Sequence, residues 1–341
     1  MSRLKALQSY ITVRLLLAPL MLWTIVTIVF ILMRVAPGDP SDAILGNRAP
    51  EAAKQALREQ LGLNKPLIGQ YFDYLGSILR FDLGSSLTSK GVTVWEIINQ
   101  HFAATVELSL FGILVALLLG VGIGVVSASR PNTPIDAFGR LFSIITYSLP
   151  IFWVGMLFQL IFAVQLRWFP LGTRFPLGDE TPQDLTGLYS IDSLLTRHWG
   201  QFFTSIYYLA LPSLTLGLLL SGIFERMVRV NLKQTLQADY IEAAKARGIS
   251  EGRILWFHAF KNALIPVITV LGLTFASLLG GAVLTEVTFS WPGLGNRLYQ
   301  AIAIRDYPTV QGLMAFFAAI VVFASIAIDI INAYIDPRIR Y

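Results

Sequence analysis

The chain has 341 residues, of which 55% are hydrophobic and only 14% are charged, whereas soluble domains carry about a quarter charged residues. This composition excludes an ordinary water-soluble enzyme and favours an integral membrane protein. The chain contains no cysteine, which excludes a disulfide framework, an iron–sulfur cluster and a cysteine zinc site. The net charge of +5 admits a nucleic-acid partner, but excess Lys and Arg in membrane proteins is typical of cytoplasmic loops.

Six runs without Asp, Glu, Lys or Arg approach the roughly 20 residues that a helix needs to cross a bilayer core of about 30 Å. They cover residues 15–33, 108–129, 141–166, 198–224, 262–285 and 307–328. Continuous runs of Leu, Ile, Val, Phe and Ala indicate helices, because the strands of a membrane barrel alternate in polarity. We therefore predict an all-α, polytopic membrane protein with six transmembrane helices. Kinks are expected near Pro19, Pro150 and Pro212, which lie within the runs.

The charges of the connecting segments predict the orientation. Residues 225–261 carry seven basic and four acidic side chains, while residues 167–197 carry three and four. The N-terminal segment adds Arg3, Lys5 and Arg14 and no acidic residue. Because basic residues accumulate on the cytoplasmic side, both termini and the 225–261 loop are predicted to be cytoplasmic. The positive charge is then explained by topology, and no nucleic-acid partner is expected.

The predicted spans divide the chain into segments. These are a cytoplasmic N-terminus with the first helix (1–35), an external loop region (36–103), a five-helix core (104–335) that contains the cytoplasmic loop 225–261, and a cytoplasmic tail (336–341). Within the external region we predict a helix from Pro50 to Leu61, because proline suits a first helical position and Gly62 suits a C-terminal stop.

The longest predicted cytoplasmic loop contains an Ala-rich tract. Residues 240–247 form a predicted short helix, ended by Gly248, which adopts a positive φ readily. Small side chains let another protein approach the backbone of such a helix closely. A capped loop helix without a partner would explain its termination, but not why this loop presents small residues.

Glu242-Ala243-Ala244, followed after three residues by Gly248, resembles the EAA loop of importer-type ABC transporter permeases. Other tracts narrow the resemblance to the dipeptide, oligopeptide and nickel permeases, and to the first of their two membrane subunits. These tracts are residues 36–40 (APGDP), 61–63 (LGL), 84–86 (GSS), 286–295 (EVTFSWPGLG), 305–308 (RDYP), 311–312 (QG) and 336–338 (DPR). The resemblance spans nearly the whole chain.

The resemblance implies a permease subunit of an ATP-driven importer in a bacterial inner membrane, for peptides or a related solute such as a nickel chelate. It also implies partners: a second homologous permease, two ATP-binding cassette ATPases, an external solute-binding protein and the lipid bilayer. The coupling helix that docks on an ATPase would present Tyr240, Glu242, Ala243, Ala244, Arg247 and Gly248. No cofactor is expected in this chain, because it lacks a phosphate loop ending in Gly-Lys-Ser or Gly-Lys-Thr; partner ATPases would bind ATP and Mg²⁺.

A path for a hydrophilic solute needs polar groups that face a cavity. The candidates on the third and fourth spans are Tyr147, Ser148, Gln159, Ser213, Thr215 and Ser221. Such residues also serve helix packing, and that alternative stays open. No catalytic or metal site is expected, because His101, His198 and His258 lack the spacing of metal ligands.

Two other classes of function are alternatives. An ion-coupled secondary transporter acting alone requires carboxylates within the membrane, and Glu107, just inside the second span, is the one acidic residue within reach; local pairing at the interface is the simpler interpretation. A membrane scaffold would use the Ala-rich tract as a general docking site. The sequence does not identify the solute, because selection lies largely in the binding protein.

Overall fold

The computed structural model describes residues 3–35, 39–46, 48–60, 62–89 and 91–335. The regular elements of these residues are all helices, apart from an isolated bridge between Ser85 and Thr93, which confirms the all-α prediction. Three sequence features lie outside the described residues: residues 36–38 of the first tract, Leu61, and the tail 336–341 with its DPR tract.

Among the residues that the structure describes, four single helices are long and apolar enough to cross a membrane. They are α1 (Arg3–Val35), α5 (Val94–Ser129), α9 (Trp199–Leu236) and α16 (Tyr307–Ile335). Two further candidates are bent pairs. In the first pair, α6 (Pro134–Ser148) meets α7 (Ile151–Phe158) and the π-helix η1 (Gln159–Gln165) at 99°. In the second, α11 (Glu251–Arg253), η2 (Ile254–Ala259) and α12 (Phe260–Ala263) meet α13 (Ile265–Leu279) at 48°.

The third predicted span, 141–166, is a broken helix and not a kinked one. Leu149 is extended, with φ −81° and ψ 134°, because Pro150 disfavours the helical region for the residue before it and cannot donate a hydrogen bond. By contrast, α1 and α9 continue through Pro19 and Pro212. The fifth predicted span also ends early, because the chain turns at Gly281, whose φ is +102°.

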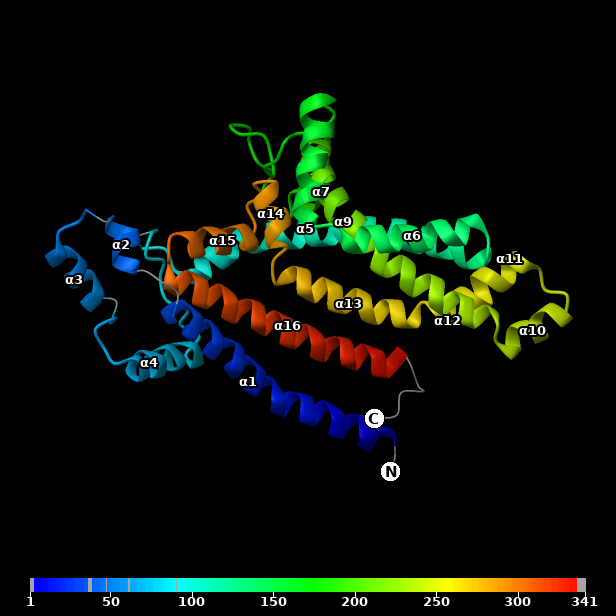
Figure 1. The fold of residues 1–341 in the computed structure, drawn as a ribbon, viewed down its shortest axis with the longest axis horizontal. Coiled ribbons are helices and arrows are strands. Elements are labelled where there is room, and N and C mark those ends of the chain that lie inside the picture. Colours follow the sequence, from blue (N-terminus) through cyan, green and yellow to red (C-terminus); the bar gives the residue numbers. More distant parts are fainter. Residues whose placement is uncertain (1–2, 36–38, 47, 61, 90, 336–341) are drawn as a thin grey trace.

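The helices α1, α5 and α16, with the second half of α9, run roughly along the long axis of the molecule (Figure 1). Three short helices lie at one end: α2 (Pro40–Leu45), α3 (Glu51–Gln60) and α4 (Leu67–Leu79). The opposite end carries α10 (Asp239–Ala246) and α11. We call these the α4 end and the α10 end. The predicted helix of residues 50–61 is observed as α3.

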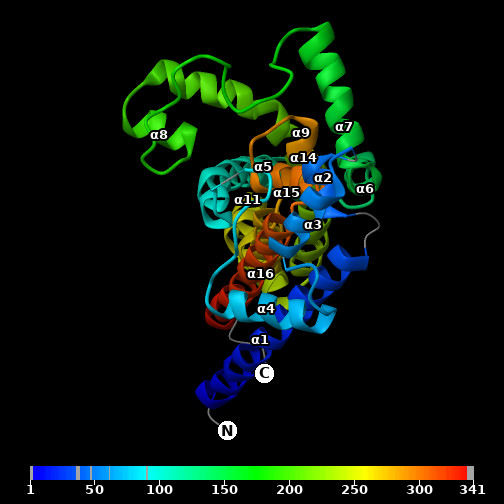
Figure 2. The same cartoon turned by 90° about the vertical axis from the view of Figure 1, so that its left-hand side faces the viewer.

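Two parts of the chain leave this bundle. Figure 2 shows α7 rising on one side, while α8 (Tyr189–Leu195) lies beside the first half of α9 on the other. Large side chains of α7 and η1 are exposed, among them Trp153 and Met156, at 44% and 49%. This apolar surface is not covered within the described chain.

Glycines bring α5 and α9 together. A Cβ added to Gly120 would lie 2.5 Å from the carbonyl oxygen of Ser221, and one added to Gly124 would lie 2.9 Å from that of Glu225. At Gly122, between them, such a Cβ would have no atom of the described chain within 4 Å. Two glycines one turn apart therefore form the close contact, as in other membrane helix pairs.

Buried carboxylates connect distant tracts of the chain. Asp306 accepts hydrogen bonds from Ser86 Oγ (2.5 Å) and the Leu87 amide (3.1 Å), which joins the GSS and RDYP tracts. Glu286, at the start of the 286–295 tract, accepts from Thr105 Oγ1 (2.8 Å). These contacts attach α14 (Val283–Thr288) to α5 and the start of α16 to the segment before α5. The Leu294 amide, which donates to Thr105 Oγ1 at 2.8 Å, attaches α15 (Leu294–Ala303) to α5 as well.

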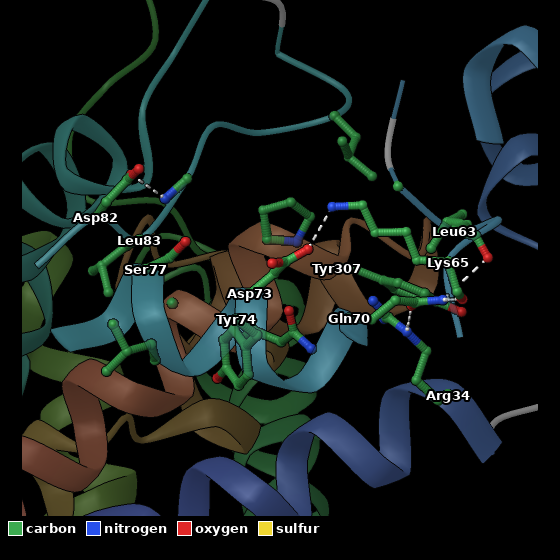
Figure 3. A pocket seen from close by; sticks show the side chains of 17 residues that line it. Arg34, Leu63, Lys65, Gln70, Asp73, Tyr74, Ser77, Asp82, Leu83 and Tyr307 are labelled. Atoms are coloured by element: carbon green, nitrogen blue, oxygen red, sulfur yellow. Dashed lines mark hydrogen bonds and ion pairs between the residues drawn. The ribbon is translucent and has the colours of Figure 1, made fainter. Parts of the chain in front are cut away.

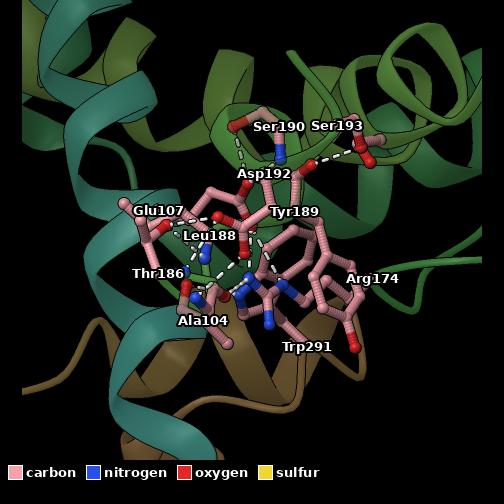
Figure 4. Close-up of polar contacts among 12 residues, drawn as sticks. Ala104, Glu107, Arg174, Thr186, Leu188, Tyr189, Ser190, Asp192, Ser193 and Trp291 are labelled. Atoms are coloured by element: carbon pink, nitrogen blue, oxygen red, sulfur yellow. Dashed lines mark hydrogen bonds and ion pairs between the residues drawn. The ribbon is translucent and has the colours of Figure 1, made fainter. Parts of the chain in front are cut away.

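Glu107 holds the irregular segment before α8 against α5 (Figure 4). Its Oε2 accepts from Arg174 Nη2 at 2.6 Å, and its Oε1 accepts from the Ser190 amide at 2.7 Å. The carboxylate is 2% exposed and Arg174 is 8% exposed. Glu107 is thus paired with an arginine 67 residues further along the chain, and its charge is compensated within the chain.

Candidate functional site

The short helix α10 follows α9 after a two-residue turn and has a well-defined end. Gly248 has φ +73°, its amide donates to the Lys245 carbonyl (2.9 Å), and the Ile249 amide donates to the Ala244 carbonyl (3.2 Å). This pair of bonds is the Schellman arrangement, in which glycine supplies the left-handed residue. No atom of the described residues lies within 4 Å of a Cβ added to Gly248, so the turn faces open space in this part of the chain.

The two faces of α10 differ. Ile241 and Ala244 are 0% and 7% exposed and belong to a hydrophobic cluster with Phe224 and Val228 of α9 and Val267 of α13. The other face is exposed and carries Glu242, Ala243, Lys245 and Arg247. The sequence pattern groups Ala243 with Ala244, but only Ala243 is available to a partner.

Tyr240 braces α10 against the next helices. Its hydroxyl accepts a hydrogen bond from Asn262 Nδ2 at 2.9 Å, and the side chain is 44% exposed. A displacement of α10 would therefore be transmitted to α12 and, through the cluster, to α9 and α13.

Sequence reasoning missed two exposed aromatic residues beside α10. Trp256 and Phe257 lie in η2, which contacts α10, and are 53% and 74% exposed. Trp256 packs edge-on against Phe260, with ring centroids 5.2 Å apart. The sequence contains the signal that could have identified them, which is a pair of adjacent aromatic residues in a loop otherwise rich in charge.

A hollow of about 850 Å³ lies between α6 and α9. It takes in two of the six residues proposed for a translocation path, Tyr147 and Ser148. The remaining lining is Arg140, Ser143, Ile144, Gly222, Ile223, Arg226, Met227, Arg229, Val230 and Asn231. The three arginines and the asparagine were missed, because charge in this part of the sequence was attributed to topology.

A buried charge cluster lies beneath this hollow. Arg229 contacts Glu225 Oε1 through Nε at 2.9 Å and Asp136 Oδ1 through Nη1 at 3.7 Å. Glu225 and Asp136 are 0% and 1% exposed. Since Asp136 belongs to α6 and the other two to α9, the cluster fixes the wall of the hollow.

The structure does not bring the other four candidates into this hollow. Ser213, Thr215 and Ser221 are buried within α9 packing, at 3%, 0% and 0% exposure, and Thr215 Oγ1 donates to the Leu211 carbonyl of its own helix at 2.9 Å. Gln159 Nε2 donates to the carbonyls of Leu171 (2.7 Å) and Thr288 (2.9 Å), which joins the irregular segment to α14. A role for these four in translocation stays a prediction.

Family models match both parts of the chain. Residues 120–341 match the model of the binding-protein-dependent transport system inner membrane component, and residues 7–109 match the N-terminal model of the same kind of membrane component. The chain therefore belongs to the family of binding-protein-dependent transport system inner membrane components, which are multi-pass permeases. A secondary transporter acting alone and a scaffold are not favoured by this membership.

Particular relatives are similar over nearly their full length. The dipeptide transport system permease protein of Alkalihalophilus pseudofirmus is 40% identical over 332 residues, covering 96% of this chain and 97% of the relative. The di/tripeptide transport system permease protein of Pseudomonas aeruginosa is 41% identical over 315 residues, covering 92% of this chain and 93% of the relative. The oligopeptide transport system permease protein AppB of Bacillus subtilis is 34% identical over 333 residues, covering 98% and 99%.

Proposed function

We propose that this chain is a membrane subunit of an ATP-driven peptide importer. The names of its relatives support a peptide as the solute. The observation that carries the proposal is the construction of α10, whose outer face is small and exposed at Ala243 and Gly248 while its inner face is anchored in the helix bundle. Such an element transmits the movement of an external partner to α9 and α13.

The proposed assembly contains a second homologous permease, two ATP-binding cassette ATPases and an external solute-binding protein. In this assembly the ATPases bind ATP and Mg²⁺, and α10 docks on one of them through Tyr240, Glu242, Ala243, Arg247 and Gly248. Ala244 contributes from inside, by holding α10 in place. The α10 end and both termini face the cytoplasm, in agreement with the excess of basic residues in residues 225–261.

The second permease is proposed to cover the exposed surfaces of α6 and α7. The hollow with Tyr147 and Ser148 opens between α6 and α9, and a facing permease would close it into a path. Arg140 and Arg226 of its lining would attract the carboxylate of a peptide, whereas Arg229 is already paired with Glu225 and Asp136. ATP-driven movement of α10 would then alter access to the hollow by shifting α9.

Replacing Gly248 with Trp tests the docking role. The bulky side chain would project into the space left open at the turn, so a partner could no longer approach the backbone. In the reconstituted complex, binding-protein-stimulated ATP hydrolysis and peptide uptake should each fall by at least about tenfold, because disrupting the core of an interface costs about 1.4 kcal/mol or more.

Two variants control for backbone strain and for bulk. Gly248→Asn keeps a residue that tolerates positive φ, so it should retain most of the activity. Gly252→Trp adds the same bulk to α11, where a Cβ also meets no atom of the described residues within 4 Å, and should leave coupling near wild type. Undiminished, ATP-coupled uptake by Gly248→Trp would refute docking at this turn.

A further inference from the structure

Arg34, in the last turn of α1, has one side-chain hydrogen bond and two cation–π contacts, but no ion pair with an acidic side chain of the described residues. Its Nε donates to Gln70 Oε1 at 2.8 Å, and its guanidinium lies 5.0 Å and 4.8 Å from the ring centroids of Phe30 and Tyr307. Within the described chain it forms no ion pair, and its buried Nη1 has no hydrogen-bond partner. A partly buried cation without a counter-ion is costly, so this geometry calls for an external anion.

A polar pocket of about 370 Å³ lies above Arg34, between α4 and the start of α16 (Figure 3). Two other polar atoms of its lining are buried without a partner among the described residues, Tyr74 Oη and Gln311 Nε2. Gln311 is 7% exposed. Buried polar groups are normally hydrogen-bonded, and three unsatisfied ones around a single pocket indicate a missing polar ligand.

Arg34 also lines a second pocket, which is apolar. This groove of about 400 Å³ runs between α1 and α4 and is lined by Trp23, Thr27, Phe30, Ile31, Arg34, Val35, Leu67, Ile68 and Tyr71. Its walls are fixed, because Phe30 and Tyr71 pack with ring centroids 5.3 Å apart and Thr27 Oγ1 hydrogen-bonds the Tyr71 hydroxyl at 2.7 Å. The apolar groove and the polar pocket therefore meet at one arginine.

The position of this joint site matches the boundary of a bilayer. α1 is a membrane-span candidate that ends next to Arg34, so the groove faces hydrocarbon and the polar pocket lies at the level of the headgroups. α4 exposes Ile68, Phe72 and Leu79 at 73%, 64% and 80%, at spacings that place them on one face of the helix. A short helix with an exposed apolar stripe is typical of the membrane interface.

We propose that this joint site binds one glycerophospholipid, with its phosphate on Arg34 and one acyl chain in the groove between α1 and α4. Arginine suits phosphate, because its planar fork donates two hydrogen bonds to it. The pocket balances Arg34 and Lys65 against Asp73 and Asp82, so its formal charge is zero. This balance favours a zwitterionic headgroup such as phosphatidylethanolamine, whose ammonium would meet Asp82, because Asp73 is already paired with Lys65 at 2.6 Å.

The experiment measures lipid retention by native mass spectrometry. The full-length chain is exchanged into detergent containing phosphatidylethanolamine, and the lipid-bound fraction is followed during delipidation. The wild type should retain one molecule, whereas Arg34→Gln should weaken retention by at least about tenfold, because it removes a charge-assisted hydrogen bond. Arg80→Gln, which removes an exposed arginine at the end of α4, should behave as the wild type.

A second variant fills the groove without touching Arg34. Ile68 is exposed, so Ile68→Trp should leave the fold intact, as checked by its circular dichroism and melting temperature, and should expel the acyl chain. Equal lipid retention in all four proteins would mean unspecific annular lipid and would overturn the proposal. It would also be overturned if the wild type retained no phosphatidylethanolamine but bound inorganic phosphate or an Ala-Ala dipeptide in an Arg34-dependent way, since the pocket would then be a site for soluble anions or for peptide.

Discussion

Ala243 and Ala244 are adjacent in the sequence but have different surroundings in the structure. Ala243 is exposed, whereas Ala244 is packed in the cluster under α10. Ala243→Trp should therefore abolish binding-protein-stimulated ATP hydrolysis without changing the melting temperature of the permease. Ala244→Leu should destabilise the chain by about 1–3 kcal/mol, because the core has no room for added methylenes. Equal loss of stability in both variants would contradict the assignment of the two faces.

The surroundings of Asp39 predict that the local stability of the α4 end depends on pH. It caps α2 through the Ser41 amide (2.8 Å) and accepts from Arg58 Nε of α3 (2.6 Å). Burial acts to raise the pKa of Asp39, but the hydrogen bonds from Ser41 and Arg58 outweigh it, so the pKa lies below its ordinary value. A depressed pKa means that the stabilisation is present above the unfolded pKa of about 3.9 and is lost as pH falls through the folded value.

Hydrogen exchange of the Gly46 amide, which donates to the Asp42 carbonyl of α2 at 2.9 Å, measures this effect. After correction for intrinsic exchange, protection should be constant from pH 7 to about pH 5 and fall below about pH 4. Asp39→Ala should lower protection at neutral pH by about 1 kcal/mol and remove the pH dependence. If the loss of protection at low pH persisted in Asp39→Ala, another titrating group would be responsible for it.

At the scale of elements, the contact of α5 with α9 depends on which face each glycine occupies. A leucine at position 120 would overlap the backbone of α9 at Ser221, whereas one at 122 would meet open space. Gly120→Leu should lower the melting temperature of the purified permease, with a cost of about 1–3 kcal/mol or more. Gly122→Leu makes the same substitution on the other face of α5 and should leave the melting temperature unchanged or slightly raised. Equal melting temperatures would show that α5 and α9 are less closely packed than described.

Local chemistry made α3 and α10 predictable. Pro50 and Gly62 bracket α3, and Gly248 ends α10, so each boundary follows from residues next to it. The break between α6 and α7 was not predictable as a break, because the apolar run continues through Leu149 and hydropathy does not distinguish a kinked helix from a bent pair. The signal was Pro150, but proline also lies inside α1 and α9, which continue.

At the scale of the whole molecule, the partners of charged residues that lie far apart in the chain could not be predicted from the sequence. Arg174 is 67 residues from Glu107, and Asp306 is 220 residues from Ser86. Each charge was visible, but its partner depends on how α5 packs against segments far along the chain. The same holds for the candidate site: local pattern located α10, whereas the hollow between α6 and α9 required the arrangement of the helices.

The orientation of the whole molecule can be tested by labelling introduced cysteines. The natural chain has no cysteine, so the label can react only at the cysteine that is introduced. Leu177, in the irregular segment before α8, is 91% exposed, and Gly252, in α11, is exposed at the α10 end. The excess of basic residues in 225–261 favours retention of that loop in the cytoplasm. A membrane-impermeant maleimide added to spheroplasts should therefore label Leu177→Cys at once and Gly252→Cys only after permeabilisation. Gly122→Cys, within α5, should resist labelling in both conditions. Labelling of Gly252→Cys in intact spheroplasts would show that the orientation is the opposite of the one proposed. The helix α10 would then lie out of reach of any cytoplasmic ATPase.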